Sequence, residues 1–259
     1  MTRERGLQLI DRLASEGRTA FRAADVQESM GLSRQASSNL LRRLVEAGLL
    51  DRIAPGRYAI RQIGTLGTAA AWDDLGSAVA AVFGGHPHRI GYLTALDHHG
   101  LLVRPVRPVQ AASSYRPRAE SLSGRPFRVV YEGPRTVLLG TEPLGPSRVA
   151  TVERALLDTA SKPKLSGGVW RLAEALTAVR RVSGLRELAQ EIGALSGYRR
   201  IGSIASTLSL SIASDWAPPQ WSSLIELDRQ SRGDKGWVDM RWGVAWPYPA
   251  TDLEAAVAA

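Results

Sequence analysis

Apolar residues recur every three or four positions in three segments near the start of the chain, which is the period of an amphipathic helix. The predicted helices run from Arg3 to Glu16, from Ala23 to Met30 and from Arg34 to Ala47. Gly31 is placed to end the second helix in the left-handed conformation, and Ser33 is placed to cap the third. The pattern therefore predicts two helices joined by a tight turn, with a supporting helix before them.

The segment after the third helix changes to a strand pattern. Residues 49–53 and 57–60 are short apolar-rich runs on either side of the turn Ala54-Pro55-Gly56, so they predict a β-hairpin. Two helices and a hairpin in this order form a winged helix-turn-helix, which places its second helix in the major groove of DNA. Arg52 and Arg57 put a cation on each arm of the hairpin and are candidates for phosphate contacts.

The third helix has two chemically different faces. At about 100° per residue, one face carries Ala36, Leu40, Leu44 and Ala47, which we expect in the core, and the opposite face is polar. Gln and Asn can pair with adenine, and Arg with guanine. The alternative is the solvated side of an ordinary helix, but the hairpin that follows favours DNA binding. The predicted DNA-contacting residues of the cap and helix are Ser33, Arg34, Gln35, Ser38, Asn39, Arg42 and Arg43.

The composition changes after residue 60. Gly64 to Thr68 is a short segment with no core residues, so we expect a DNA-binding domain over residues 1–63 and a second domain over residues 69–259. The remainder alternates helix-like and strand-like stretches. The predicted fold class is mixed, an N-terminal winged helix-turn-helix followed by a C-terminal mixed α/β domain. Expected helices are 69–83, 91–99, 152–161, 169–181, 185–192 and 199–212, and expected strands are 107–112, 127–131, 137–139 and 148–150, with a closing hairpin of 223–227 and 237–242.

Composition narrows the class of protein. A chain of 259 residues with 44% hydrophobic residues is long enough for two globular domains, and the lack of cysteine excludes disulfides, thiolate zinc sites and cysteine nucleophiles. No apolar run approaches the roughly 18 residues needed to span a bilayer, and the N-terminus lacks the apolar core of a signal peptide. We therefore expect a cytoplasmic protein with no membrane partner.

The formal charge of +8 is carried almost wholly by arginine. Between residues 104 and 128, six arginines stand against the single acid Glu120. This stretch is either a second nucleic-acid surface, for DNA flanking an operator or for RNA, or a solvated basic loop. Its candidate contact residues are Arg104, Arg107, Arg116, Arg118, Arg125 and Arg128.

Candidate catalytic and metal-binding groups are few. His86, His88, His98 and His99 lie within fourteen residues, but without cysteine or an HExxH pattern they do not predict a metal site. His98 and His99 end a predicted helix, where imidazoles favourably face the negative end of the dipole. On the helix 152–161, Arg154 and Asp158 have the spacing of an i,i+4 ion pair. No phosphate-binding loop, dinucleotide fingerprint or nucleophile elbow occurs, so we expect no catalysis and no cofactor.

Four segments together resemble the AbiEi family of abortive-infection antitoxins of type IV toxin–antitoxin systems. They are the hairpin Gly48 to Tyr58, the segment Gly91 to Leu101, the segment Val152 to Asp158, and the helix start Arg200-Ile201-Gly202 with its tryptophan-containing closing strand. The resemblance covers nearly the whole chain. It implies a winged helix that represses its own operon and a C-terminal domain that counteracts a nucleotidyltransferase-like toxin, without a stable complex between the two proteins.

Two other functions are compatible with the sequence. The chain could be a stand-alone winged-helix regulator whose second domain senses a ligand or dimerises. It could also be an enzyme acting on nucleic acid that uses the winged helix for targeting. An apolar pocket with converging polar groups would favour the regulator, and turnover of nucleic acid would favour the enzyme.

Overall fold

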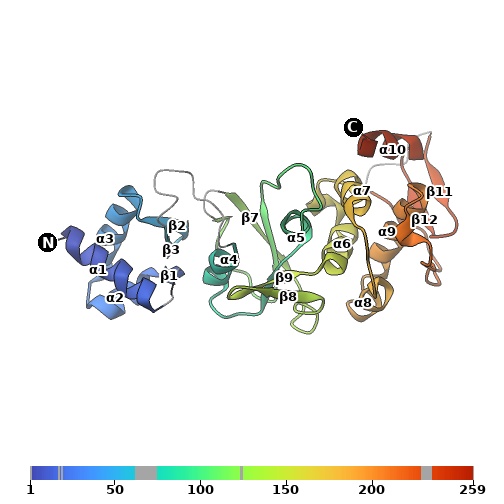
Figure 1. The fold of residues 1–259 in the computed structure, drawn as a ribbon. Coiled ribbons are helices and arrows are strands. Elements are labelled where there is room, and N and C mark those ends of the chain that lie inside the picture. Colours follow the sequence, from blue (N-terminus) through green and yellow to red (C-terminus); the bar gives the residue numbers. More distant parts are fainter. Residues whose placement is uncertain are drawn as a thin grey trace.

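The computed structural model describes residues 2–16, 18, 20–61, 75–122, 125–228 and 235–258. The predicted linker Gly64 to Thr68, and with it the domain boundary, lies outside these residues. Figure 1 shows an elongated molecule, with a small helical module at the N-terminal end, a sheet in the middle and further helices toward the C-terminus. The mixed fold class predicted from the sequence is confirmed.

The N-terminal module has the predicted winged-helix elements. Helices α1 (Thr2–Ser15), α2 (Ala23–Met30) and α3 (Arg34–Glu46) pack beside a sheet of β1 (Ala20–Arg22), β2 (Leu50–Ala54) and β3 (Arg57–Ile60) in the order β1-β3-β2. The three-residue strand β1 was not predicted, because its pairing with β3 joins residues almost forty positions apart. The core of the module consists of Leu9, Leu13, Phe21, Val26, Leu40, Leu41, Leu44, Leu50 and Tyr58.

The region predicted as a second domain, called the second domain below, is built on a mixed six-stranded sheet of the order β6-β7-β5-β4-β9-β8 within the described residues. Strands β5 and β7 are parallel, as are β4 and β9, and the other neighbours are antiparallel. Helix α4 (Leu75–Phe83) precedes the sheet. The strands are β4 (His88–Ile90), β5 (Val109–Ser113), β6 (Ser121–Leu122), β7 (Arg125–Tyr131), β8 (Thr141–Leu144) and β9 (Ser147–Ala150).

Helices and a small sheet form the C-terminal end of the molecule (Figure 1). Helices α5 (Tyr92–His98) and α6 (Val152–Ser161) lie beside the six-stranded sheet. The helices nearer the C-terminus are α7 (Val169–Ala178), α8 (Leu185–Glu191), α9 (Leu195–Thr207) and α10 (Ala250–Ala258), and the strands are β10 (Ile225–Glu226), β11 (Trp237–Asp239) and β12 (Val244–Trp246). Trp242 and Trp246 are fully buried. Gly202 of α9 lies so close to Trp242 that a β-carbon there would overlap the indole ring. None of the described helices is long and apolar enough to cross a membrane.

The predicted strand 137–139 is wrong, because these residues form a turn. The backbone carbonyls of Val137 and Leu139 accept hydrogen bonds from two buried guanidinium groups, at 2.8 Å in each case, instead of from a neighbouring strand. The branched side chains that suggested a strand therefore lie in a loop held by side-chain donors.

The predicted closing hairpin is also wrong. Strand β11 ends at Asp239, whose Oδ1 accepts hydrogen bonds from the backbone amides of Arg241 (3.0 Å) and Trp242 (3.2 Å) and turns the chain. Strand β12 then lies between β10 and β11, parallel to the first and antiparallel to the second. The predicted helix 199–212 begins earlier, at Leu195, and ends at Thr207 before Ser209, which has a left-handed φ of 51°.

Candidate nucleic-acid interface

The turn between α2 and α3 is built as the sequence predicted. Gly31 has φ 61° and ψ 31°, a left-handed conformation that a glycine adopts without steric cost. The Oγ of Ser33 accepts a hydrogen bond from the backbone amide of Ala36 at 3.2 Å, which satisfies one of the free amides of the first turn of α3. These two local devices fix the point where α3 begins.

The buried face of α3 differs by one position from the predicted one. Ser37, Leu40, Leu41 and Leu44 are buried, whereas Ala36 and Ala47 are exposed, so their assignment to the core was wrong. Ser37 is tolerated inside because its hydroxyl donates to the carbonyl of Arg34 at 3.0 Å. The leucines are larger than the alanines, and their burial sets the rotation of the helix.

The opposite face of α3 is exposed. The exposed set contains all the residues predicted there and at the cap: Ser33, Arg34, Gln35, Ser38, Asn39, Arg42 and Arg43. Arg42 Nη1 is 2.8 Å from Glu46 Oε1, and both side chains are about 60% exposed. Such an exposed pair is weak, so Arg42 can exchange Glu46 for another anion. The face therefore offers amide and guanidinium groups that are free to reach base edges, and contact with DNA stays a prediction.

The start of α2 is held by a small ionic cluster. Asp25 accepts the backbone amide of Arg22 at 2.9 Å and receives the guanidinium groups of Arg22 and Arg18. Burial alone would raise the pKa of Asp25, but the Arg22 hydrogen bonds and the two positive charges outweigh it and hold the pKa below its ordinary value. The cluster fixes the point where α2 begins.

The two arginines of the wing have different surroundings. Arg52 is exposed, whereas Arg57 is half-buried and its guanidinium lies beside Gly84 at the C-terminal end of α4. Burial, followed by the charge of Arg22, lowers the pKa of Arg57. A phosphate contact stays a prediction for both residues, but Arg57 would have to leave the second domain to make one.

The sheet of the module is covered on both faces. Phe21 and Tyr58 point into the core of the module, whereas Ile53 is buried in the main core of the second domain together with Val82 and Phe83 of α4. Ala20 and Ala59 pack against the same core from β1 and β3. Figure 1 shows α4 next to this sheet. The sheet of β1, β2 and β3 therefore packs against the core of the second domain as well as against the core of the module.

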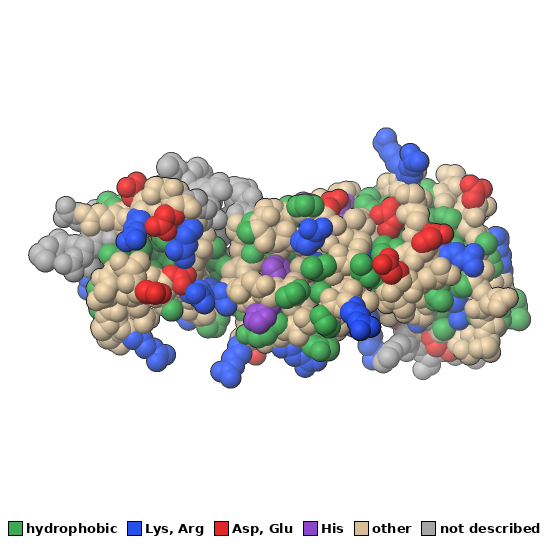
Figure 2. Space-filling model, turned by 90° about the horizontal axis from the view of Figure 1, so that it is seen from below, with side chains coloured by type: hydrophobic (Ala, Val, Ile, Leu, Met, Phe, Trp, Pro, Cys, Tyr) green, Lys and Arg blue, Asp and Glu red, His purple; other side chains and the backbone are tan. Residues whose placement is uncertain are grey.

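The basic stretch from residue 104 to residue 128 does not form one patch. Arg107 precedes β5 and Arg116 follows it, so they lie beyond opposite ends of a five-residue strand, which is about 13 Å long. Arg125 is half-buried and donates to the carbonyls of Val106 and Arg107. Figure 2 likewise shows Lys and Arg side chains spread along the molecule. Arg104, Arg107, Arg116, Arg118 and Arg128 are exposed.

The histidines have structural partners. His88 Nε2 is 2.7 Å from Ser147 Oγ, and burial lowers its pKa. His98 is in the last turn of α5 and His99 is its C-cap residue, so the two histidines end this helix as predicted. His99 Nε2 is also 2.7 Å from the carbonyl of Ala150 in β9, so its ring joins the helix to the sheet. Within the described residues, no group of three or more potential ligands could hold a metal ion.

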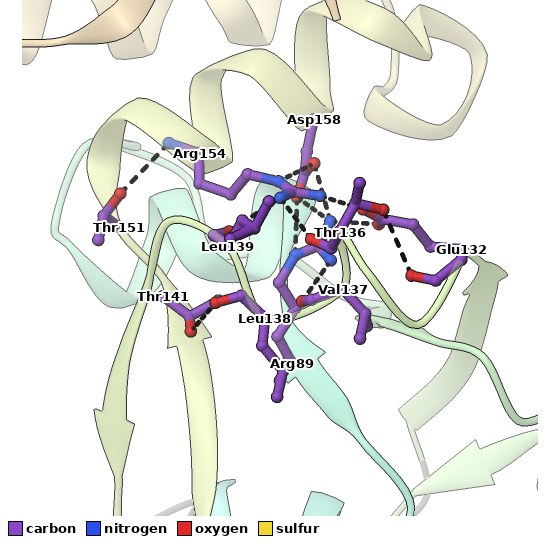
Figure 3. A network of polar contacts seen from close by, with 11 residues as sticks. Arg89, Glu132, Thr136, Val137, Leu138, Leu139, Thr141, Thr151, Arg154 and Asp158 are labelled. Atoms are coloured by element: carbon purple, nitrogen blue, oxygen red, sulfur yellow. Dashed lines mark hydrogen bonds and ion pairs between the residues drawn. The ribbon is translucent and has the colours of Figure 1, made fainter. Parts of the chain in front are cut away.

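A buried charge network in the second domain was predicted only in part. The expected pair of Arg154 and Asp158 is present, with Nε and Oδ1 2.9 Å apart, but Arg89 of β4 and Glu132 after β7 join it (Figure 3). Arg89 Nη2 is 2.9 Å from Asp158 and 2.6 Å from Glu132, and Arg154 also binds Glu132. No local signal could reveal it, because the four residues come from three distant segments.

The positive and negative charges of the network balance, and its guanidinium groups have hydrogen-bond acceptors on several sides. Burial would raise the pKa of Glu132, but Arg89 and Arg154 together hold it below its ordinary value. The two guanidinium groups also donate to the carbonyls of Thr136, Val137 and Leu139, as Figure 3 shows. Each charge is matched within the cluster, which favours a structural role that ties β4, the 134–140 turn and α6 together over catalysis.

Comparisons with known proteins agree with this geometry. Residues 8–61 match the family described as transcriptional regulator, AbiEi antitoxin. The predicted resemblance is thus confirmed over the winged helix. No curated protein matches the chain. The crystal structure of the Rv2827c protein from Mycobacterium tuberculosis is similar over 97% of this chain and 94% of that one, with a TM-score of 0.64 and 15% sequence identity. At this identity the likeness establishes a shared fold.

Proposed function

We propose that this protein is a DNA-binding repressor that acts as the antitoxin of a toxin–antitoxin operon. The observation that carries the proposal is the capped helix α3, which exposes Gln35, Asn39 and Arg42 in a module that matches antitoxin transcriptional regulators. In this role α3 reads operator bases in the major groove, and Arg52 with Arg57 binds phosphates beside it. The protein represses its own promoter.

The second part of the proposal concerns the toxin. We infer that the C-terminal domain counteracts a nucleotidyltransferase-like toxin encoded beside it, without forming a stable complex. The support is the family match of the module and the resemblance of the segments at 91–101 and 152–158 to the same family. Co-expression with the neighbouring open reading frame tests this: restored growth supports the antitoxin role, and continued growth arrest contradicts it.

Operator binding is tested on DNA from upstream of the gene. Replacing Gln35, Asn39 or Arg42 singly by Ala should weaken binding by about 1–3 kcal/mol and relax the preference at particular base pairs. Arg52→Ala and Arg57→Ala should weaken binding to all sequences alike. A footprint that none of these changes alters would contradict the role of α3.

The chain offers a matched control for Arg42. Arg12 also forms an i,i+4 pair with a glutamate, at 3.1 Å compared with 2.8 Å, and its side chain is 60% exposed compared with 61% for Arg42. Arg12→Ala therefore removes the same charge from the same local environment on α1. It should leave base preference unchanged.

A stand-alone regulator with a ligand-sensing second domain is the second candidate. One observation favours it, a cavity of about 470 Å³ whose lining includes Lys162, Lys164, Leu165 and Arg200, a size typical of small-molecule sites. Operator binding that persists together with failure to neutralise the neighbouring toxin would select this candidate.

A further inference from the structure

Four exposed side chains gather where two parallel strands end. Tyr131 is the last residue of β7 and lies opposite Ser113, the last residue of β5. Two residues beyond Ser113, the ring of Tyr115 stacks on His86, with centroids 4.0 Å apart and planes 10° apart. Arg116 then lies over the Tyr131 ring, 5.5 Å from its centroid. We name His86, Tyr115, Arg116 and Tyr131 the aromatic surface.

The rings of the aromatic surface are open to solvent. Tyr131 is 55% exposed and Tyr115 is 39% exposed, and His86 and Arg116 are exposed as well. Tyr115 contacts His86 and Tyr131 contacts Arg116, and the exposed part of each tyrosine is available to a further planar group. Exposed aromatic rings that touch cations are a common feature of binding sites and contribute little to the core.

The backbone beneath the aromatic surface is fixed in place. Ser113 Oγ donates to the carbonyl of Pro87 at 2.6 Å and accepts the amide of Tyr115 at 3.0 Å, which ties the segment carrying Tyr115 to the segment carrying His86. Glu132, directly after Tyr131, is held by the buried guanidinium groups of Arg89 and Arg154. The rings are therefore held in position before any ligand arrives, which lowers the entropy cost of binding.

The charge around the aromatic surface is positive. Arg116 is part of it, and the guanidinium of Arg57 lies beside Gly84, two residues before His86. The neighbouring acid, Glu132, is already neutralised by Arg89 and Arg154. Planar rings with adjacent guanidinium groups suit a ligand that combines flat bases with phosphates.

We propose that the aromatic surface binds unpaired bases of a single-stranded nucleic acid. Bases stack on Tyr131 and on the His86–Tyr115 pair, and Arg116 binds the phosphate between them. Duplex DNA cannot use this site, because its bases are already stacked and paired. The site is separate from the exposed face of α3, so it goes beyond operator binding and does not depend on it.

The test uses the full-length protein and fluorescein-labelled oligouridylate and oligothymidylate of about twelve nucleotides, within the site sizes known for single-strand binding. Binding is measured by anisotropy. Tyr131→Ala and Tyr115→Ala should each weaken binding about 5- to 100-fold. Tyr131→Phe keeps the ring and should bind as the unchanged protein does. A preference between the two oligonucleotides distinguishes RNA from DNA as the ligand.

Two further measurements test whether bases stack on Tyr131 and whether this site is separate from the operator site. A 2-aminopurine placed in the oligonucleotide should lose fluorescence on binding the unchanged protein and lose less on binding Tyr131→Ala, because stacking quenches it. Asn39→Ala should leave single-strand affinity unchanged, which separates this site from the operator site. The proposal is overturned by equal single-strand affinity of Tyr131→Ala and Tyr131→Phe, or by an equal loss of duplex and single-strand binding in Tyr131→Ala.

Discussion

Two arginine pairs with the same sequence spacing differ in environment between the domains. In the winged helix, Arg12 and Glu16 are 3.1 Å apart with side chains 60% and 41% exposed. In the second domain, Arg154 and Asp158 are 2.9 Å apart with side chains 2% and 5% exposed. The surface pair is screened by water, whereas the buried pair has given up its hydration and depends on its partners. Burial, and not sequence spacing, decides how much an arginine ion pair contributes to the free energy of unfolding.

The largest expected effect comes from breaking the buried pair. Asp158→Ala leaves Arg89 and Arg154 buried with half of their compensating charge, so we expect a loss of about 3–5 kcal/mol in the free energy of unfolding. Glu16→Ala is the matched change in the surface pair and should cost at most about 1 kcal/mol. Urea unfolding of the full chain measures both. Similar losses for the two variants would show that the buried ion pair contributes no more to stability than the exposed one.

Removing a contact between the wing sheet and the core of the second domain should have the next largest effect on stability. Ile53→Ala removes a side chain that is 1% exposed, so we expect a loss of about 2–4 kcal/mol in the full chain. A fragment of residues 1–63 is expected to fold and bind DNA, and in that fragment Ile53 has no second domain to pack against. The same substitution should therefore cost far less there. Equal losses in fragment and full chain would place Ile53 in the core of the module, and an unfolded fragment by circular dichroism would show that the module needs the second domain.

A smaller effect separates stability from recognition within α3. Ser33→Ala removes the cap of the helix and should lower the free energy of unfolding by about 1 kcal/mol. Ser38→Ala, on the exposed face of the same helix, should change it by less than about 0.5 kcal/mol while weakening operator binding. Thermal unfolding and operator titration of both variants check this. An unchanged free energy of unfolding in Ser33→Ala would show that the Ser33 cap does not stabilise the turn.

The smallest effect is confined to acid. Because the folded-state pKa of Asp25 lies below its ordinary value, its stabilising contribution is present above that ordinary value and is lost as the pH falls through the folded-state pKa. We expect Asp25→Asn to cost about 0.2–1 kcal/mol at neutral pH and the difference from the unchanged protein to vanish in strong acid. Unfolding at a series of pH values measures this difference, and a difference independent of pH would contradict the assigned pKa direction.

The elements predicted well are those whose signals are local. The turn before α3 needs only Gly31 and Ser33, two residues that act on their immediate neighbours. The helix 152–161 was predicted with the bounds that the structure gives it, and Thr151 caps its start. Such elements carry their start, stop and apolar face within one window of sequence.

The elements missed depend on distant residues. The 134–140 turn replaces a predicted strand because Arg89 and Arg154 take its carbonyls, and strand β12 lies inside the small sheet because β10 reaches it across nearly twenty residues. The candidate recognition residues could be listed from helical periodicity. The aromatic surface could not, because His86, Tyr115 and Tyr131 meet only when β4, β5 and β7 share a sheet.

The sheet shared by the two domains limits how this protein can have diversified. Domain shuffling works best where the exchanged unit has a polar outer surface, but the wing sheet here presents Ile53, Ala20 and Ala59 to α4. A winged helix transferred to another protein without α4 would carry an exposed apolar strip into its new setting. We expect the wing face and the α4 face to have changed together during descent, so that the two domains are inherited as one unit.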